Sequence, residues 1–170
     1  IVFNKSGHPG APKDYNLDNT EEVYIKTEDN LKLLSWYHKG NNSLPLIVYF
    51  HGNSFHIGDR AYRIQRYIEK NWSVLLVSWR GFGGNEGNPT EKNLYKDAEA
   101  VLKWIKNNTE FKFKELVIYG ESLGSGAAVE MGTKYEFLSI VLEAPFTSIN
   151  DIAKNRYKIF PTKYLVKDQF

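Results

Sequence analysis

Four short apolar runs stand out along the chain. They are "LPLIVYF" (44–50), "SVLLVSW" (73–79), "ELVIYG" (115–120) and "LSIVLEA" (138–144). Each run is continuous rather than alternating, which is typical of strands that are covered on both faces of a parallel sheet. We therefore expect four buried parallel strands.

Two earlier segments predict a β-hairpin. The sequences "EEVYIKT" and "LKLLSWYH" lie on either side of "EDN", a turn-forming cluster, and both are rich in β-branched, aromatic or other apolar residues. Residues 1–20, by contrast, are rich in Pro, Gly, Asn and Asp and are expected to be irregular.

Helical patterns fill the gaps between the apolar runs. Apolar residues recur at helical spacing over residues 57–68 and 94–105, and Thr90 is placed to cap the second helix. A third helix, rich in Gly and Ala, is expected from Ser122 to about Lys134. Right-handed crossovers convert this order into an α/β fold, a mostly parallel sheet with helices on both faces. Without repeats or linkers, residues 1–170 are expected to form a single domain.

A serine lies between two glycines in "YGESLGSG" (119–126), where Gly120, Ser122 and Gly124 have the spacing G-x-S-x-G. The segment follows an apolar strand and precedes a helix of small residues, which is the context of a nucleophile elbow. Such a turn lifts the hydroxyl above the strand ends, and the helix N-terminus favours an oxyanion. Side chains at the glycine positions would collide with the neighbouring strand and helix. The alternative is a tight turn with an incidental serine.

The sequence "HGN" (51–53) directly follows the first apolar run, residues 44–50. Acyl-transfer enzymes aim two N–H donors at the developing oxyanion, each worth roughly 3–4 kcal/mol. The expected donors are the backbone amides of Leu123 and Asn53, and Gly52 permits the turn between strand and loop. His51 is expected to be structural. A catalytic base at His51 or at His56 is the alternative.

A glycine-rich loop, "RGFGGNEGNP" (80–89), follows the second apolar run, residues 73–79. Its glycines allow the chain to curl near the pocket. Arg80 is expected to brace loops beside the site, and the alternative is a surface arginine in an ordinary connection between strand and helix.

These three motifs, HGN, RGFG with EG-x-P, and G-x-S-L-G, occur in an order that resembles the α/β-hydrolase superfamily over about residues 20–152. The phrase "NPTEKNLYKDAEAVLKWI" is similar to the Bem-like branch of serine hydrolases, which is often membrane-anchored, and protein depalmitoylases carry a related pattern. The resemblance implies an α/β-hydrolase fold, Ser122 as nucleophile, and the amides of Asn53 and Leu123 as oxyanion hole. It implies no metal and no organic cofactor.

The pattern breaks off after the serine. In that family the triad follows the order Ser, acid, His, but all 4 histidines precede Ser122. We therefore expect the N-terminal two-thirds of a hydrolase domain, with an unpaired sheet edge beside "LSIVLEA" and the catalytic His and acid beyond Phe170. Glu143 is a candidate acid, with a bracing carboxylate as the alternative, and Asp151 is a weaker candidate. Residues 147–170 are expected to form a plain connecting segment, with a cap or lid as the alternative.

Composition narrows the function further. The net charge is +2 and the basic residues are dispersed, which argues against a nucleic-acid partner. The chain has no Cys, which excludes a disulfide, a thiol nucleophile and a Cys-ligated zinc site. The apolar runs are too short to span a bilayer. Because the chain opens at Ile1 rather than Met, an upstream segment that could include a hydrophobic anchor is expected, with the protein in the cytoplasm or at a membrane.

The sequence thus predicts a serine hydrolase that cleaves carboxylic esters or thioesters of a small-molecule or lipid acyl substrate through an acyl-enzyme on Ser122. Two alternatives remain: a non-catalytic binding protein with this fold, and an amidase or peptidase on the same scaffold. Because no histidine follows the serine, residues 1–170 alone are expected to lack efficient hydrolase activity.

Overall fold

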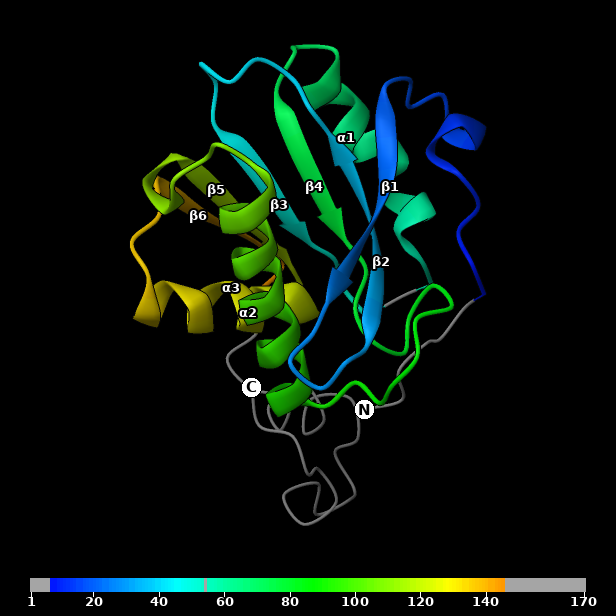
Figure 1. The fold of residues 1–170 in the computed structure, drawn as a ribbon, viewed down its shortest axis with the longest axis vertical. Coiled ribbons are helices and arrows are strands. Elements are labelled where there is room, and N and C mark those ends of the chain that lie inside the picture. The colour runs from blue at the N-terminus through cyan, green and yellow to red at the C-terminus, as the bar shows by residue number, and fades with distance from the viewer. Residues whose placement is uncertain (1–6, 54, 146–170) are drawn as a thin grey trace.

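A computed structural model describes residues 7–53 and 55–145, whose strands form one six-stranded sheet in the order β1-β2-β4-β3-β5-β6 (Figure 1). The strands are β1 (Thr20–Lys26), β2 (Lys32–His38), β3 (Leu46–Phe50), β4 (Ser73–Val77), β5 (Leu116–Glu121) and β6 (Ser139–Glu143). Strands β4, β3, β5 and β6 are parallel to one another. The β1–β2 hairpin joins them through an antiparallel pairing of β2 with β4. The predicted fold class, a mostly parallel sheet with an N-terminal hairpin, is confirmed.

Helices cover both faces of the sheet. Helices α2 (Glu91–Asn108) and α3 (Leu123–Lys134) lie on one face, and α1 (Ala61–Ile68) lies on the other (Figure 1). The predicted cap of α2 is present, because the Thr90 side chain accepts a hydrogen bond from the Asn93 amide at 3.3 Å. The first predicted helix is divided, since Ile57–Arg60 forms a 3-10 turn, η2, before α1 begins.

Two hydrophobic cores result from the alternation of side chains along the central strands. In β3, Leu46, Val48 and Phe50 point into the core beneath α2 and α3. Their neighbours Ile47 and Tyr49 point into the second core, which includes residues of η2 and α1. Strands β3 and β4 are buried at every position, as their continuous apolar runs predict.

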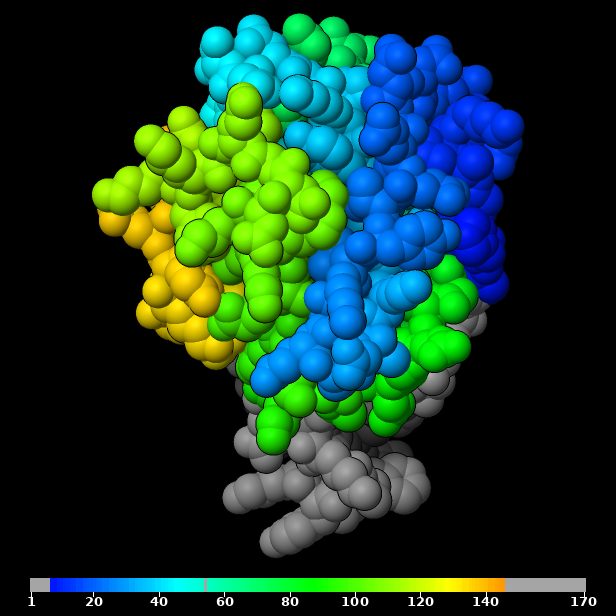
Figure 2. All heavy atoms as spheres, in the orientation of Figure 1, coloured from blue at the N-terminus to red at the C-terminus, as the bar shows by residue number. Residues whose placement is uncertain are grey.

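The hairpin lies beside α2 on the first face. Figure 2 shows the two segments side by side at the surface. The rings of Tyr37 in β2 and Trp104 in α2 meet edge to face with centroids 5.5 Å apart. This contact anchors the hairpin to α2. In the described part of residues 1–20, a 3-10 turn, η1 (Pro12–Tyr15), precedes β1, so the segment is less irregular than predicted.

Strand β6 contradicts the prediction of a strand covered on both faces. Ile140, Val141 and Leu142 are 38–39% exposed. Within residues 7–53 and 55–145, β6 is an edge strand that pairs only with β5. On one face α3 packs close to it, since a Cβ on Gly132 would lie 2.4 Å from the Ile140 side chain. The apolar run therefore forms a strand, but within the described residues its side chains are partly exposed on both faces, because burial requires covering layers that the strand itself does not supply.

Two further expectations concern residues outside this range. The cap or connecting segment at 147–170 and the weaker candidate Asp151 both lie outside the described residues. Among the residues that are described, no helix combines the length and the apolar character needed to cross a membrane.

Candidate active site

Ser122 lies at the junction between β5 and α3. Its backbone has φ of 47° and ψ of −109°, a combination outside the regions that residues with a side chain normally adopt. The Ser122 amide donates to the Glu143 carbonyl at 2.8 Å, and the Ser122 carbonyl accepts from the Ser125 amide at 2.9 Å. Strain of this kind, held by surrounding bonds, is concentrated at functional sites.

Close backbone approach explains the two glycines of the motif. A Cβ on Gly120 would lie 2.7 Å from the Ser125 Cα and 2.9 Å from the Ala128 Cβ, both in α3. A Cβ on Gly124 would lie 2.1 Å from the Phe50 carbonyl oxygen in β3. The helix therefore sits directly against the sheet, with its N-terminus at the carboxyl end of β3.

The loop after β3 passes beside the serine. Because β3 and β5 pair in parallel with Phe50 opposite Gly120, the segments that follow them emerge at the same edge of the sheet. A Cβ on Gly52 would lie 3.3 Å from the Ser122 Cβ, so the two segments are in contact. Asn53 lies three residues after Phe50, and Leu123 lies three residues after Gly120, so the two residues are at equivalent positions beyond the paired strands.

The Leu123 amide is the first of helix α3. The first four N–H groups of a helix have no acceptor within it, and they carry the positive end of the helix dipole. The arrangement can therefore offer an N–H donor next to the Ser122 hydroxyl. That hydroxyl has no hydrogen-bond partner among residues 7–53 and 55–145.

His51 is fully buried, and both its ring nitrogens are engaged. Nδ1 donates to the Gly52 carbonyl at 2.7 Å, and Nε2 accepts from the Trp79 amide at 3.4 Å. Burial, with the nearby charge of Arg60, lowers the pKa of the imidazole to about 4. A neutral ring with both nitrogens occupied pins the start of the loop and is unsuited to act as a base.

The side chains of the other three histidines lie beside polar groups other than the Ser122 hydroxyl. His56 Nδ1 lies 3.5 Å from the Asp59 carboxylate in its own loop. His38 Nδ1 lies 3.2 Å from a threonine hydroxyl of β1, and His8 Nδ1 accepts from a glycine amide at 3.1 Å. Within the described part of the chain, no histidine is hydrogen-bonded to Ser122.

Glu143 lies at the end of β6, and its carboxylate is held on the α1 side of the sheet. Oε2 accepts from Arg63 Nη1 and from the Tyr119 hydroxyl, each at 2.6 Å. The hydrogen bond from Arg63 lowers the pKa of this carboxyl. The side chain thus connects β6 to α1 and β5, which is the geometry of a brace.

Arg80 connects three parts of the fold. Its guanidinium is buried and lies 2.7 Å from Asp97 in α2 and 2.7 Å from Asp29 in the hairpin turn. The Arg80 amide also donates to Asp97 at 3.0 Å. The side chain therefore ties the loop after β4 to the hairpin and to α2, and it has no bond to the serine.

A second carboxylate beside the serine was not anticipated from the sequence. Glu121 accepts two hydrogen bonds from Arg60 and one from the Tyr49 hydroxyl. These residues are far apart along the chain, so no local pattern links them. The one available signal was a charged residue inside a motif between an apolar strand and a helix of small residues.

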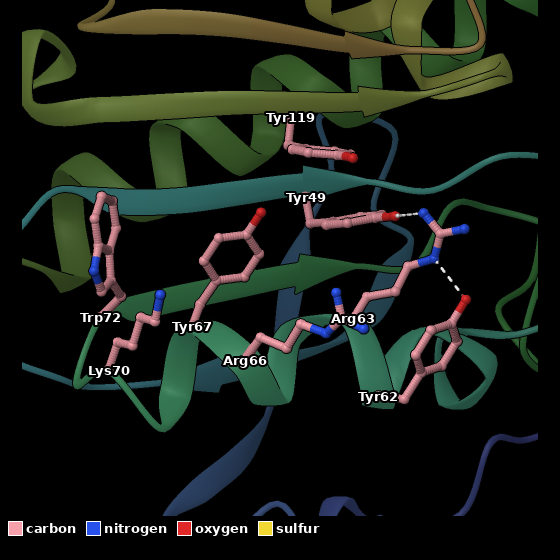
Figure 3. Close-up of a pocket in the computed structure, with 8 residues that line it drawn as sticks. All are labelled: Tyr49, Tyr62, Arg63, Arg66, Tyr67, Lys70, Trp72 and Tyr119. Carbon is pink, nitrogen blue, oxygen red and sulfur yellow. Dashed lines mark hydrogen bonds between the residues drawn. The ribbon is translucent and has the colours of Figure 1, made fainter.

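An open cleft of about 520 Å³ adjoins this cluster on the α1 side of the sheet (Figure 3). The stacked rings of Tyr49 and Tyr119, with centroids 4.6 Å apart, form one wall. Arg63 lies between them and Tyr62, donating to both Tyr49 and Tyr62 hydroxyls (Figure 3). The lining residues are Tyr49, Tyr62, Arg63, Arg66, Tyr67, Lys70, Trp72 and Tyr119. Ser122 is not among them, so the cleft and the elbow are separate features.

Comparison with known proteins identifies the class. The family described as "Hydrolase_4: Serine aminopeptidase, S33" matches residues 42–167. The chain therefore belongs to this family of α/β-hydrolases. Among solved structures, the Pyrococcus furiosus esterase Pf2001 has a TM-score of 0.77 at 24% sequence identity, covering 97% of this chain and 66% of that one. That likeness shows the fold.

Relatives place the chain in the Bem-like branch. The protein bem46 of Schizosaccharomyces pombe is 30% identical over 84% of this chain and 49% of its own length. The lysophosphatidylserine lipase ABHD12 of Danio rerio is 29% identical over 91% of this chain and 47% of its own length. The chain spans 47% to 61% of the length of such curated relatives. The resemblance seen in the sequence motifs is confirmed.

Proposed function

We propose that this chain carries the nucleophile and the oxyanion hole of a serine hydrolase that cleaves carboxylic esters or thioesters. The observation that carries the proposal is the backbone of Ser122, held at positive φ between β5 and α3 with Gly52 against its side chain. Such a turn presents a hydroxyl at the carboxyl edge of the sheet, next to a helix N-terminus.

In the proposed reaction, the Ser122 hydroxyl oxygen attacks the acyl carbonyl carbon. The amides of Leu123 and Asn53 donate to the oxyanion, and its collapse expels the alcohol or thiol, which takes up a proton. Water then cleaves the acyl-enzyme, releasing the acid and restoring the hydroxyl. A serine hydroxyl needs a positioned base at neutral pH, and we propose that a histidine beyond Phe170 supplies it. Gly120 and Gly124 shape the turn.

The bonding of the other candidates supports structural roles. His51 and Arg80 are engaged in bonds that hold loops, and the Glu143 carboxylate is turned toward Arg63 and Tyr119. We therefore propose that Glu143 braces β6 and that the acid of the triad, like the base, is a residue beyond Phe170. The names of a lipase relative and an esterase of the same fold favour an ester of a lipid or other acyl group as substrate.

A fluorophosphonate probe, which phosphonylates activated serines, tests the nucleophile. We expect a version of the chain extended to the length of its relatives to be labelled and to hydrolyse a short acyl ester. Ser122→Ala should abolish both, whereas Ser139→Ala, at an exposed serine in β6, should change neither. Residues 1–170 alone should show little turnover. Retained labelling in Ser122→Ala would show that the nucleophile is another residue.

Amide cleavage is a second candidate, which the family description as a serine aminopeptidase favours. An ester, a thioester and an amide with the same acyl group separate the two activities. Faster ester or thioester turnover supports the proposal, and faster amide turnover supports the second candidate. A chain that neither labels nor turns over any of them would be a binding protein with a hydrolase fold.

A further inference from the structure

An ion pair between Arg60 and Glu121 lies directly beneath the elbow. Arg60 Nη2 donates to Glu121 Oε1 at 2.8 Å, and Arg60 Nε donates to Oε2 at 3.1 Å. The side chains are only 7% and 15% exposed. Two parallel bonds from a planar guanidinium to a carboxylate fix the relative orientation of both groups as well as their distance.

The two partners belong to the two segments of the proposed site. Glu121 directly precedes Ser122. Arg60 is the last residue of η2, which ends the loop that begins at His51 after β3. The loop passes the carboxylate as well, since a Cβ on Gly52 would lie 3.0 Å from Glu121 Oε1. The pair therefore ties the far end of the loop to the residue next to the nucleophile.

The carboxylate is satisfied from more than one side. Besides the fork from Arg60, Oε2 accepts from the Tyr49 hydroxyl at 3.0 Å. Burial alone would raise the pKa of Glu121, but the hydrogen bonds and charge of Arg60 hold it below its usual value. Glu121 is therefore ionised at neutral pH, and the pair is a buried salt bridge.

Stability alone is a weak reason to bury such a pair. Desolvation of two charges offsets most of their attraction, and apolar residues of similar volume often stabilise a fold equally well or better. Two packed apolar side chains can shift along each other, whereas two parallel hydrogen bonds fix the relative orientation of the guanidinium and the carboxylate. The best-attested use of buried charges is to fix one register among several.

We propose that Arg60 is a positioning residue for the reaction: its fork on Glu121 holds the loop that carries Asn53 in register with Ser122. This inference rests on the proposed function. Donors and nucleophile must be held within about 0.5 Å of their working geometry. A displacement of about 1 Å can slow a reaction about 100-fold.

Kinetics of the ester-hydrolysing version tests the role. Arg60→Met removes the fork, and we expect kcat to fall about 30- to 100-fold while KM changes less than about 3-fold, because binding of the acyl group is retained. Arg60→Lys keeps the charge without the fork and should recover only part of the loss, to within about 10-fold of the parent. The fraction of molecules labelled by the fluorophosphonate probe gives the concentration of folded, active protein, and dividing the turnover rate by it gives kcat for each variant.

Arg63→Met is the matched control. Arg63 lies one helical turn after Arg60 and pairs with Glu143 through one hydrogen bond at 2.6 Å, with side chains 31% and 36% exposed, so it is a neighbouring arginine pair without the buried fork. We expect its kcat to stay within about 2-fold of the parent. An equal loss in the Arg63 and Arg60 variants would overturn the specific role of Arg60.

Amide hydrogen exchange on residues 1–170 provides a readout that needs no turnover. In Arg60→Met the amides of residues 52, 53 and 55–59 should exchange at least about 10-fold faster, while those of β3 and β4 are unchanged. The Arg63→Met variant should match the parent.

The outcomes separate this inference from the proposed function. If Ser122→Ala keeps its turnover, the proposed function fails. If Ser122→Ala is inactive but folded Arg60→Met molecules keep the parent kcat and loop exchange, the pair only stabilises the fold and this inference fails. Should Arg60→Met not fold, the same comparison is decided with Arg60→Lys, where full parental kcat would overturn the inference.

Discussion

Acidification should destabilise the fold through His51. The folded imidazole has a pKa of about 4, against 6.5 for an unperturbed histidine, because it is buried beside the charge of Arg60. Between these values the unfolded chain binds a proton that the folded chain does not. The free energy of unfolding therefore keeps its full His51 contribution above about pH 6.5 and loses it as the pH falls toward 4. At about 1.36 kcal/mol per pH unit, the loss is about 3 kcal/mol.

Urea unfolding followed by tryptophan fluorescence at several pH values between 7 and 4.5 measures this loss. His51→Gln has no titrating ring, so it should be less stable than the parent at pH 7, and the difference should shrink by about 2.4 kcal/mol at pH 4.5. Taking the difference removes the contribution of His38, whose pKa burial also lowers. It likewise removes Glu121 and Glu143, whose lowered pKa values matter at more acid pH.

A difference that stays constant within about 0.5 kcal/mol between pH 7 and 4.5 would refute the reasoning. It would mean that His51 takes up a proton as readily in the folded chain as in the unfolded one. In that case the bonds of its ring to Gly52 and Trp79 would not describe the protein in solution, and His51 would again be available as a base.

Three further predictions concern the same region. Gly124→Ala forces a Cβ to within 2.1 Å of the carbonyl oxygen of β3, and should lower the free energy of unfolding in urea by about 3 kcal/mol or more. Asp97→Asn leaves the buried Arg80 charge partly uncompensated, and should lower the same quantity by about 3 kcal/mol. Asn53→Pro removes the proposed donor N–H and should reduce ester turnover about 100-fold or more. Asn53→Ala keeps that N–H and should reduce turnover far less, so equal effects would exclude the backbone donor.

Local patterns were sufficient for the fold. Within the described residues, apolar runs and helical spacing identify the six strands and the three α-helices to within about four residues, because each pattern follows from which side of one element is buried, whereas η1 was not predicted. They did not reveal that β6, within the described residues, is partly exposed on both faces. Burial of Val141 depends on what lies across the sheet, and that information is absent from the strand itself.

The site was predictable only in part, for a similar reason. G-x-S-x-G predicts a sharp turn at Ser122, which the structure has, because such a turn needs glycines within two residues of it; the role of Ser122 as nucleophile stays a prediction. The direction of the Glu143 carboxylate depends on Arg63, 80 residues away, and Arg60 pairs with Glu121 across 61 residues. A single sequence contains no local signal for such partners, so a carboxylate at a strand end could be read as an acid or as a brace.

The pairing of β3 with β5 also has a consequence for the order of folding. Phe50 and Gly120 are direct neighbours in the sheet, but they are 120 − 50 = 70 residues apart along the chain. Contacts of such long sequence separation form late, because loop closure must precede them. The β1–β2 hairpin can form while the chain is still being synthesised, whereas the Gly52 loop meets Ser122 only after β5 has emerged and docked. We therefore expect the site to be among the last parts of the domain to form, so pulse-labelled amides of β5 should gain protection after those of the hairpin.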